Sequence, residues 1–164
     1  MQYVVKYLGL HLDQRLTWRK QIKTKRHNLN PKLAGMYWLL GRRSKLSLEN
    51  KLPLHKFVLK PVWAYGIQLW GCAKPSHTQI IQRLQSKILR SITNGPWYVS
   101  NFTLHSELLI PFVSTEISIL SFLYHQRLAG HHNALMTAMT TLHSIVRRLK
   151  RPWTTDLPHT TAGD

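Results

Sequence analysis

The sequence predicts a mainly α-helical protein with one β-strand or hairpin at its N-terminus. Apolar residues recur at helical spacing along most of the 164 residues, in segments separated by proline, glycine and asparagine. A run rich in β-branched, aromatic and leucine residues is confined to positions 3–12. Hydrophobic residues make up 43% of the chain, which is enough for a packed core.

Residues 3–12 are expected to form a strand that ends at Asp13, with Lys6 as its one charged residue. A lone strand leaves its backbone N–H and C=O groups unpaired, so it needs partner strands. We expect those partners to lie outside this chain. The alternative is an edge strand that pairs within the chain, with a weak strand near residues 99–104.

The first helix is predicted after Asp13, where the apolar period changes from two to about 3.6 residues. Thr17 is its candidate N-cap. Pro31 lies within the stripe, where it would cost about 3 kcal/mol in a straight helix. A break or kink near Asn30 is therefore expected. The apolar stripe consists of Trp18, Ile22, Leu29, Leu33, Met36 and Leu40.

A second helix is predicted after residues 41–44, with Ser47 as its N-cap. Pro53 falls in its first turns, where proline is tolerated, and Pro61 is expected to bend or end it. The following residues, 63–71, carry no charge and include two tryptophans. This segment is the best candidate for the hydrophobic centre of the fold.

A third helix is predicted to start at Ser76, because Gln79 completes a capping-box pattern. Residues 94–96, Asn-Gly-Pro, are expected to stop it. Its apolar residues fall on one face, and another face carries Arg83, Lys87 and Arg90.

The last part of the chain is also predicted to be helical. Helices are expected at residues 102–109 and 115–129, separated by Ile-Pro at 110–111, and a final one at 133–149. A basic run at 147–151 and a polar tail follow.

Charge is the most unusual bulk property. The chain has 23 Lys and Arg against 6 Asp and Glu, a net charge of +17. Nucleic acid, an anionic membrane or an acidic protein would all suit so basic a chain. No apolar run approaches the roughly 20 residues of a membrane span, and no signal-peptide core precedes the strand. With Cys72 as the single cysteine, we expect a soluble intracellular protein, neither secreted nor bound to a membrane.

The sequence contains no recognisable catalytic, metal or cofactor motif. Carboxylate and two-metal catalysis need acidic groups close together, and here they are isolated in sequence. The adjacent His131 and His132 are expected to direct their rings to different sides of a helix or strand, and zinc-ligand spacings are absent. Phosphate-binding glycine loops are also absent. We therefore assign no catalytic residue, metal ligand or cofactor. The acidic residues are Asp13, Glu49, Glu107, Glu116, Asp156 and Asp164.

Basic residues on the first helix are the strongest candidates for binding nucleic acid. Lysine and arginine neutralise phosphates in any base sequence. The alternative is a solvated helix face. Weaker candidates are the loop cations Arg42 and Arg43 and the run at 147–151. The helix candidates are Arg19, Lys20, Lys23, Lys25 and Arg26.

Five blocks, in one order, resemble the C-terminal part of the reverse transcriptase, an RNA-directed DNA polymerase, of Jockey-type non-LTR retrotransposons. The resemblance covers most of residues 3–135. The blocks are YLGLHLDQRLTWRKQI, YWLLGRRSKLSLENK, KPVWAYGIQLWG, QSKILRSI and PWYVSN.

In that family a palm domain carries a hairpin with metal-binding aspartates, upstream of a Tyr-Leu-Gly strand that borders the primer and leads into a helical thumb. Tyr7, Leu8 and Gly9 match this strand. The resemblance implies that the chain starts after the aspartates, so this chain alone would not polymerise and the Mg²⁺ of the whole enzyme would be held elsewhere. The implied partners are an RNA or RNA–DNA duplex and the palm and fingers of the same polyprotein. Nuclear entry at integration is also implied.

The implied organisation is a palm-strand remnant at 1–16, a thumb-like region at 17–72, a C-terminal helical region at 73–150 and a polar tail at 151–164. Pro31 and Pro53 depart from the pattern expected of the family. Two alternatives stay open: a free-standing basic helical module that binds nucleic acid or protein, with Trp63 and Trp70 exposed as an interface, and a relic without function.

Overall fold

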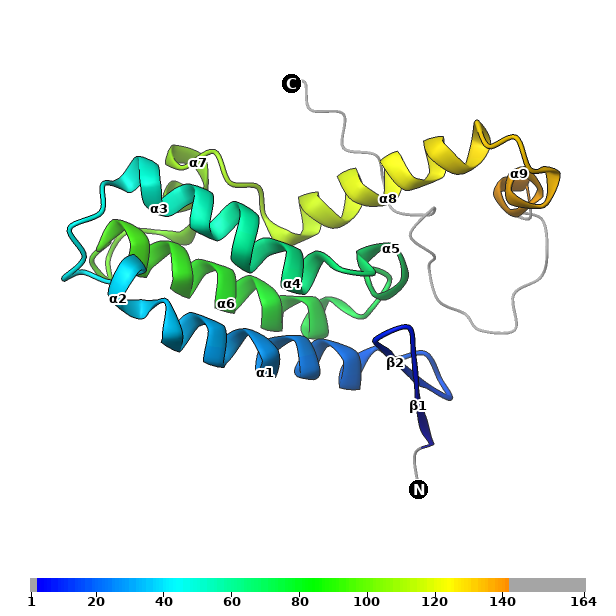
Figure 1. Cartoon of the computed structure of the whole chain (residues 1–164), viewed down its shortest axis with the longest axis horizontal. Coiled ribbons are helices and arrows are strands. Elements are labelled where there is room, and N and C mark those ends of the chain that lie inside the picture. The colour runs from blue at the N-terminus through cyan, green and yellow to red at the C-terminus, as the bar shows by residue number, and fades with distance from the viewer. Residues whose placement is uncertain (1–2, 142–164) are drawn as a thin grey trace.

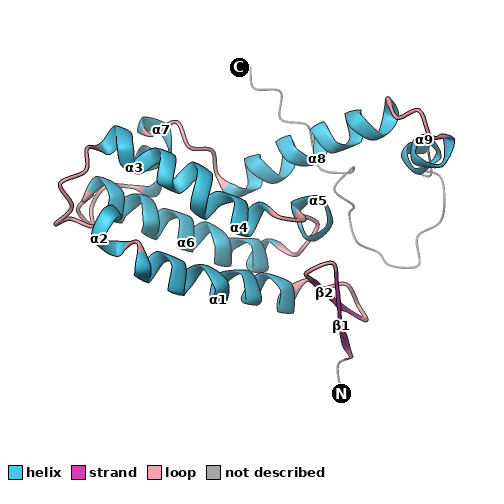
Figure 2. Ribbon diagram, viewed as in Figure 1, coloured by secondary structure: helices cyan, strands magenta, loops and turns pink. Residues whose placement is uncertain are grey.

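The computed structural model describes residues 3–141, which are mostly helical (Figure 1; Figure 2). A mainly α-helical fold with an N-terminal hairpin is therefore confirmed. The elements are β1 (Val4–Tyr7), β2 (Leu10–Asp13), α1 (Arg19–Gly35), α2 (Tyr37–Leu40), α3 (Leu48–Leu54), the π-helical turn η1 (His55–Leu59), α4 (Lys60–Ala64), α5 (Ile67–Trp70), α6 (Pro75–Thr93), α7 (Asn101–Glu107), α8 (Val113–Ala129) and α9 (Ala134–Thr141).

The N-terminal segment is a hairpin and not one strand. β1 pairs antiparallel with β2, with Tyr7 opposite Leu10, so the partner of the first strand lies in the same segment. Leu8 and Gly9 form the turn, both with positive φ (46° and 76°), as the turns that suit hairpin twist require. The alternative of pairing near residues 99–104 is also wrong, because α7 begins at Asn101.

Three helical rows form the main body. α1 and α6 lie side by side and run in the same direction, while α3, η1 and α4 run back beside them (Figure 1). Near the start of both parallel helices, Nδ1 of His77 lies 3.2 Å from the carbonyl oxygen of Thr17. The core between the rows includes Ile22, Leu29, Leu59 and Leu89, all 0% exposed.

The uncharged segment after the second helix is the centre of this core, as predicted. Trp63, Ile67 and Trp70 are 2%, 0% and 0% exposed. The indole N–H of Trp70 donates to the carbonyl of Tyr65 at 3.1 Å, which satisfies its one polar atom. The alternative in which these two tryptophans form an exposed interface is therefore wrong.

Proline does not end the helices where the sequence suggested. α1 continues through Pro31 to Gly35, so the expected break near Asn30 is absent. The carbonyl that loses its donor belongs to His27, on the exposed side of the helix, where water can replace the missing bond. Because water substitutes there, the penalty is smaller than in a buried helix.

The second helix also continues past its prolines. Pro53 lies in α3, Pro61 lies at the start of α4, and the wider turn η1 joins the two helices. A single π-helical turn is a common irregularity within an α-helix. The helix therefore ends at Ala64, beyond the predicted end at Pro61.

The ends of α6 follow ordinary rules. It begins at Pro75, one residue before the predicted cap Ser76, because proline suits the first position of a helix. It ends as predicted at Asn94, whose φ of 53° is left-handed, and the N–H of Gly95 donates to the carbonyl of Arg90.

α8 extends away from the three rows, and α9 lies at its far end (Figure 1). The predicted helices at 102–109 and 115–129 agree with α7 and α8 within two residues. The rings of His131 and His132 stack at 4.5 Å between α8 and α9, so the expectation that they point apart is wrong. They lie in the loop between the two helices and not in a regular element. The predicted end of the last helix and the basic run at 147–151 fall outside the described residues.

Within residues 3–141, no helix combines the length and apolar character needed to cross a bilayer.

Candidate nucleic-acid interface

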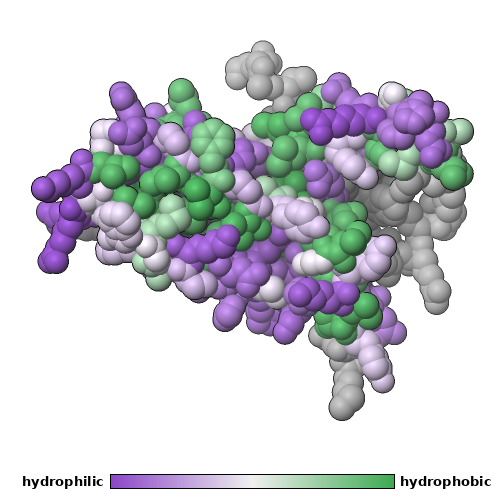
Figure 3. Space-filling model, in the orientation of Figure 1, coloured by the Kyte–Doolittle hydropathy of each residue, from purple (hydrophilic) through white to green (hydrophobic). Residues whose placement is uncertain are grey.

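The exposed face of α1 carries a basic stripe. Arg19, Lys23 and Arg26 are spaced by four and three residues, so they share one side of the helix, and all three are exposed. Lys20 is also exposed and lies three residues before Lys23, so it flanks the stripe. Hydrophilic side chains gather along the edge formed by α1 in Figure 3. Four of the five predicted α1 cations are thus accessible to a ligand.

Lys25, the fifth predicted phosphate ligand, is buried and does not lie on the exposed face of α1. Its side chain is 5% exposed, and its ammonium donates to the carbonyls of Tyr65 (2.7 Å) and Val62 (3.3 Å). The ammonium also lies 5.5 Å from the ring centre of Tyr65. Burial lowers the pKa of Lys25 to about 8. Lys25 ties α1 to α4, and we leave it out of the interface.

Asp13 fixes the start of α1. Its carboxylate accepts hydrogen bonds from the backbone N–H of Thr17 (2.9 Å) and Trp18 (3.1 Å) and from the Thr17 hydroxyl (2.7 Å). Burial raises the pKa of Asp13, but these bonds lower it by more, so the pKa lies below its ordinary value. Trp18 and not Thr17 occupies the N-cap position. These hydrogen bonds therefore fix the position at which α1, and with it the basic stripe, begins.

α6 contributes a second stripe with the same spacing. Arg83, Lys87 and Arg90 again follow at intervals of four and three residues. A groove of about 580 Å³ separates part of this stripe from that of α1. Its basic lining residues are Arg26, Arg83 and Lys87, and the buried Leu84 and Ile88 also contribute. Tertiary packing thus brings together cations that are 57 or more residues apart in sequence.

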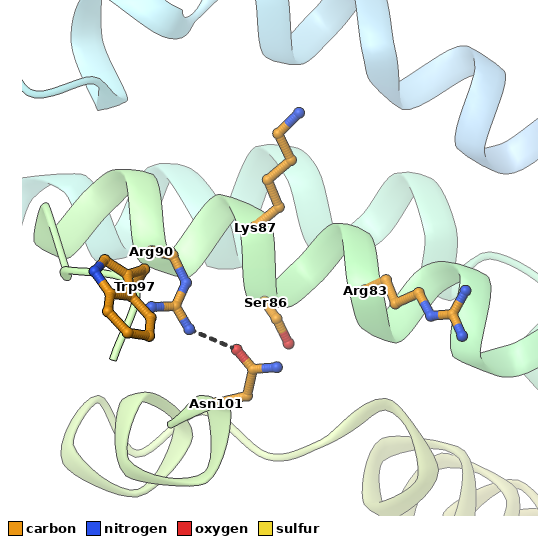
Figure 4. A pocket seen from close by; sticks show the side chains of 6 residues that line it. All are labelled: Arg83, Ser86, Lys87, Arg90, Trp97 and Asn101. Atoms are coloured by element: carbon orange, nitrogen blue, oxygen red, sulfur yellow. Dashed lines mark hydrogen bonds between the residues drawn. The ribbon is translucent and has the colours of Figure 1, made fainter. Parts of the chain in front are cut away.

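A second hollow of about 390 Å³ lies on the other side of the α6 stripe (Figure 4). It shares Arg83 and Lys87 with the groove, so the two hollows form one continuous basic surface. The remaining lining residues are Ser86, Arg90, Trp97 and Asn101. Figure 4 shows Trp97 beside Arg90, with Lys87 directed toward α1. The sequence analysis did not predict that Trp97 lies beside these cations. The available signal was a tryptophan next to the predicted end of a basic helix.

The other predicted site residues lie at the two ends of α1 (Figure 1). Tyr7, Leu8 and Gly9 form the exposed tip of the hairpin near its start, where the Tyr65 hydroxyl donates to the carbonyl of Leu8 at 2.8 Å. Arg42 and Arg43 are exposed in the loop after α2, beyond its end. The structure therefore separates these two groups and does not form one compact site from them.

Few cations on this surface are neutralised by carboxylates. None of the residues described as lining the groove or the second hollow is acidic. The one ion pair within residues 3–141 joins Lys60 to Glu116, away from both stripes in sequence. The described part of the chain also holds no cluster of three or more His, Cys, Asp or Glu side chains. The positive charge of the surface suits binding of a polyanion.

Sequence comparison identifies close relatives. The chain is 47% identical over 152 residues to a probable RNA-directed DNA polymerase from transposon X-element of Drosophila melanogaster. It is 36% identical over 160 residues to the RNA-directed DNA polymerase from mobile element jockey of Drosophila funebris, and 38% identical over 146 residues to a probable RNA-directed DNA polymerase from transposon BS of Drosophila melanogaster. These matches cover 93%, 93% and 89% of the chain.

The chain spans only 17%, 18% and 16% of the length of these relatives. No protein-family model matches the sequence. No solved structure is detectably similar to it. The identities nevertheless extend over nearly the whole chain, which confirms the resemblance that the five sequence blocks suggested. The chain is therefore homologous to one segment of the RNA-directed DNA polymerases of Jockey-type non-LTR retrotransposons.

Proposed function

We propose that this chain is the thumb-like segment of such a polymerase and grips the sugar–phosphate backbone of an RNA or RNA–DNA duplex without reading its sequence. The observation that carries the proposal is the groove between α1 and α6, lined by Arg26, Arg83 and Lys87 and by no acidic side chain among the described residues. Cations on two fixed helices can contact successive phosphates of a duplex. The exposed Arg19 and Lys23 extend the same surface along α1.

The hairpin supports a second part of this proposal. Val5, Tyr7 and Leu8 are 64%, 63% and 71% exposed on the two-stranded sheet. A two-stranded sheet with apolar side chains in water is marginally stable alone, so further strands or another domain would cover it. We propose that the palm of the polymerase supplies this cover and that Tyr7, Leu8 and Gly9 then lie near the primer.

Nucleotide transfer in the whole polymerase would use Mg²⁺, but the described residues do not fit such a site. Asp13 is engaged in hydrogen bonds to Thr17 and Trp18, and Glu116 is paired with Lys60. Since two-metal chemistry requires carboxylates that share the ions, we assign no catalytic step to these residues. The proposed role is binding alone.

The proposal is tested with the full chain and a fluorescently labelled blunt RNA–DNA duplex in an anisotropy titration across a salt series. We expect the affinity to fall steeply with salt. A triple variant, Arg26→Gln, Arg83→Gln and Lys87→Gln, should reduce the slope of log K against log salt by roughly 2 to 3 units, because each phosphate contact contributes about 0.7 to 0.9.

The matched control removes the same charge from exposed cations that line neither hollow, with Lys56→Gln, Lys74→Gln and Arg127→Gln. It should keep most of the slope. Cooperative thermal unfolding of each variant confirms that the fold is intact. Equal slopes for the two triple variants would contradict the proposed groove, because binding would then depend only on net charge.

A further inference from the structure

The second hollow has one feature that a grip on duplex backbone does not require. Trp97 forms part of its wall and is 89% exposed, the most exposed large hydrophobic side chain in the described part of the chain. Tyr98 beside it is 73% exposed and contacts it edge to face, with ring centres 6.0 Å apart. Contiguous exposed apolar side chains, unlike scattered single ones, indicate a binding surface.

The loop that presents Trp97 is held firmly. The guanidinium of Arg90 donates to the carbonyls of Pro96 and Val99. It also donates to the side-chain oxygen of Asn101 (Figure 4). At the end of the loop, the Ser100 hydroxyl accepts from the N–H of Thr103 at 3.0 Å and caps α7. Arg90 is therefore a positioning residue, and Trp97 is held outward by a fixed backbone.

The surroundings of Trp97 are basic. The same hollow is lined by Lys87 and Arg83, which also line the groove between α1 and α6. A continuous surface thus leads from the proposed duplex grip to the exposed indole. Proteins that bind single-stranded nucleic acid combine these two features, cations for the backbone and aromatic rings on which unpaired bases stack.

We propose that the hollow beside α6 binds unpaired nucleotides next to the duplex, with a base stacked on Trp97 and the flanking phosphates near Lys87 and Arg83. This inference rests on the proposed function, because the groove delivers the strand to the hollow. Ser86 and Asn101 also line the hollow, but Ser86 is buried and the side-chain oxygen of Asn101 accepts from Arg90, so neither is assigned to reading the base. Stacking tolerates any base, so no sequence preference is expected.

The test compares three labelled probes in the same anisotropy assay with the full chain. They are a blunt RNA–DNA duplex, the same duplex with a single-stranded adenine overhang, and the overhang strand alone. The variants are Trp97→Ala, Trp97→Phe, which keeps a ring, and Trp38→Ala. Trp38 is a matched control because it is 73% exposed but lines neither hollow.

We expect the overhang to strengthen binding and Trp97→Ala to abolish that gain, a loss of roughly 5- to 150-fold for one stacked base. Blunt-duplex binding should stay within about twofold, because a stack on Trp97 needs an unpaired base. Trp97→Phe should retain much of the gain, and Trp38→Ala all of it. This pattern separates stacking from charge.

Two results would overturn the inference: an overhang that adds no affinity, or a gain that survives Trp97→Ala. Intact blunt-duplex binding in either case leaves the proposed function standing. Conversely, Trp97-dependent binding of the strand alone, without binding of the blunt duplex, would support the stacking site and overturn the duplex grip.

Discussion

The ammonium of Lys25 donates a 2.7 Å hydrogen bond to the backbone carbonyl of Tyr65, 40 residues away, from a position that is 5% exposed. This contact joins the basic helix α1 to the end of α4. Because few water molecules reach the charge, the pKa of Lys25 falls to about 8 from its ordinary value of 10.5. A lysine that would be taken for a surface residue is part of the fold.

The lowered pKa of Lys25 predicts a pH dependence of stability. Between pH 8 and 10.5 the unfolded chain keeps a proton on Lys25 that the folded chain has lost. The free energy of unfolding therefore increases as pH rises through this range. In Lys25→Met this gain should disappear, while the exposed control Lys20→Met should keep it. Urea unfolding at a series of pH values measures the difference. Parallel profiles for wild type and Lys25→Met would show that Lys25 titrates normally.

His55 predicts loss of stability in acid. The side chain is 1% exposed, and its two ring nitrogens have no hydrogen-bond partner among the described residues. Burial, followed by the charges of Lys60, His105 and Lys56, lowers its pKa to about 4 from 6.5. Between pH 6.5 and 4 the unfolded chain therefore binds more protons than the folded chain. The free energy of unfolding falls as pH drops through this range, by up to about 3 kcal/mol.

The change that tests His55 is substitution by leucine. His55→Leu should flatten the profile between pH 6.5 and 4 and should not destabilise the protein at pH 7, since it removes unpaired buried nitrogen atoms. His27→Leu, on the exposed side of α1, is the control and should keep the wild-type profile. Chemical unfolding from pH 4 to 7 provides the measurement. Acid sensitivity that persists in His55→Leu would assign it to other groups.

Local pattern predicted the parts of the fold that local forces determine. The charge-free run around Trp63 and Trp70 became the core because nothing in it resists burial. α6 ends at Asn94 because asparagine accommodates the left-handed cap conformation. The continuation of α1 through Pro31 was missed because the cost of proline depends on whether the freed carbonyl meets water, which the sequence does not specify.

Features that depend on distant contacts could not be predicted. Leu8 adopts a positive φ that leucine rarely visits, and the hydroxyl of Tyr65, 57 residues away, bonds its carbonyl. The α1 and α6 stripes were visible separately, but only packing shows that Arg26 faces the groove shared with Arg83. The burial of Lys25 could not be predicted for the same reason, because its hydrogen-bond partners are carbonyls at the end of another helix.

Two glycines predict opposite effects of the same substitution. Gly66 has a φ of 66°, and a Cβ there would lie 2.9 Å from Leu10 Cδ2, so Gly66→Ala should cost about 1–2 kcal/mol or more. Gly35 ends α1 with no neighbour within 4 Å of an added Cβ, so Gly35→Ala should gain about 0.5–1 kcal/mol. Thermal unfolding of both variants measures the pair. A neutral Gly66→Ala would mean that the hairpin does not pack on this turn.

The Asp13 carboxylate links the hairpin to the basic helix, because it ends β2 and accepts three hydrogen bonds from Thr17 and Trp18. Asp13→Ala leaves these donors unpaired and should lower the free energy of unfolding by about 1–3 kcal/mol. Asp13→Asn keeps one acceptor oxygen and should lose less. The control Glu107→Ala removes an exposed carboxylate at the end of α7 and should have little effect.

Because the pKa of Asp13 is lowered on folding, its contribution is present above the ordinary value of 3.8 and is lost as pH falls below it. Urea unfolding at pH 7 and pH 3 measures both effects, and an Asp13→Ala protein as stable as Glu107→Ala at pH 7 would show that the start of α1 does not depend on this carboxylate.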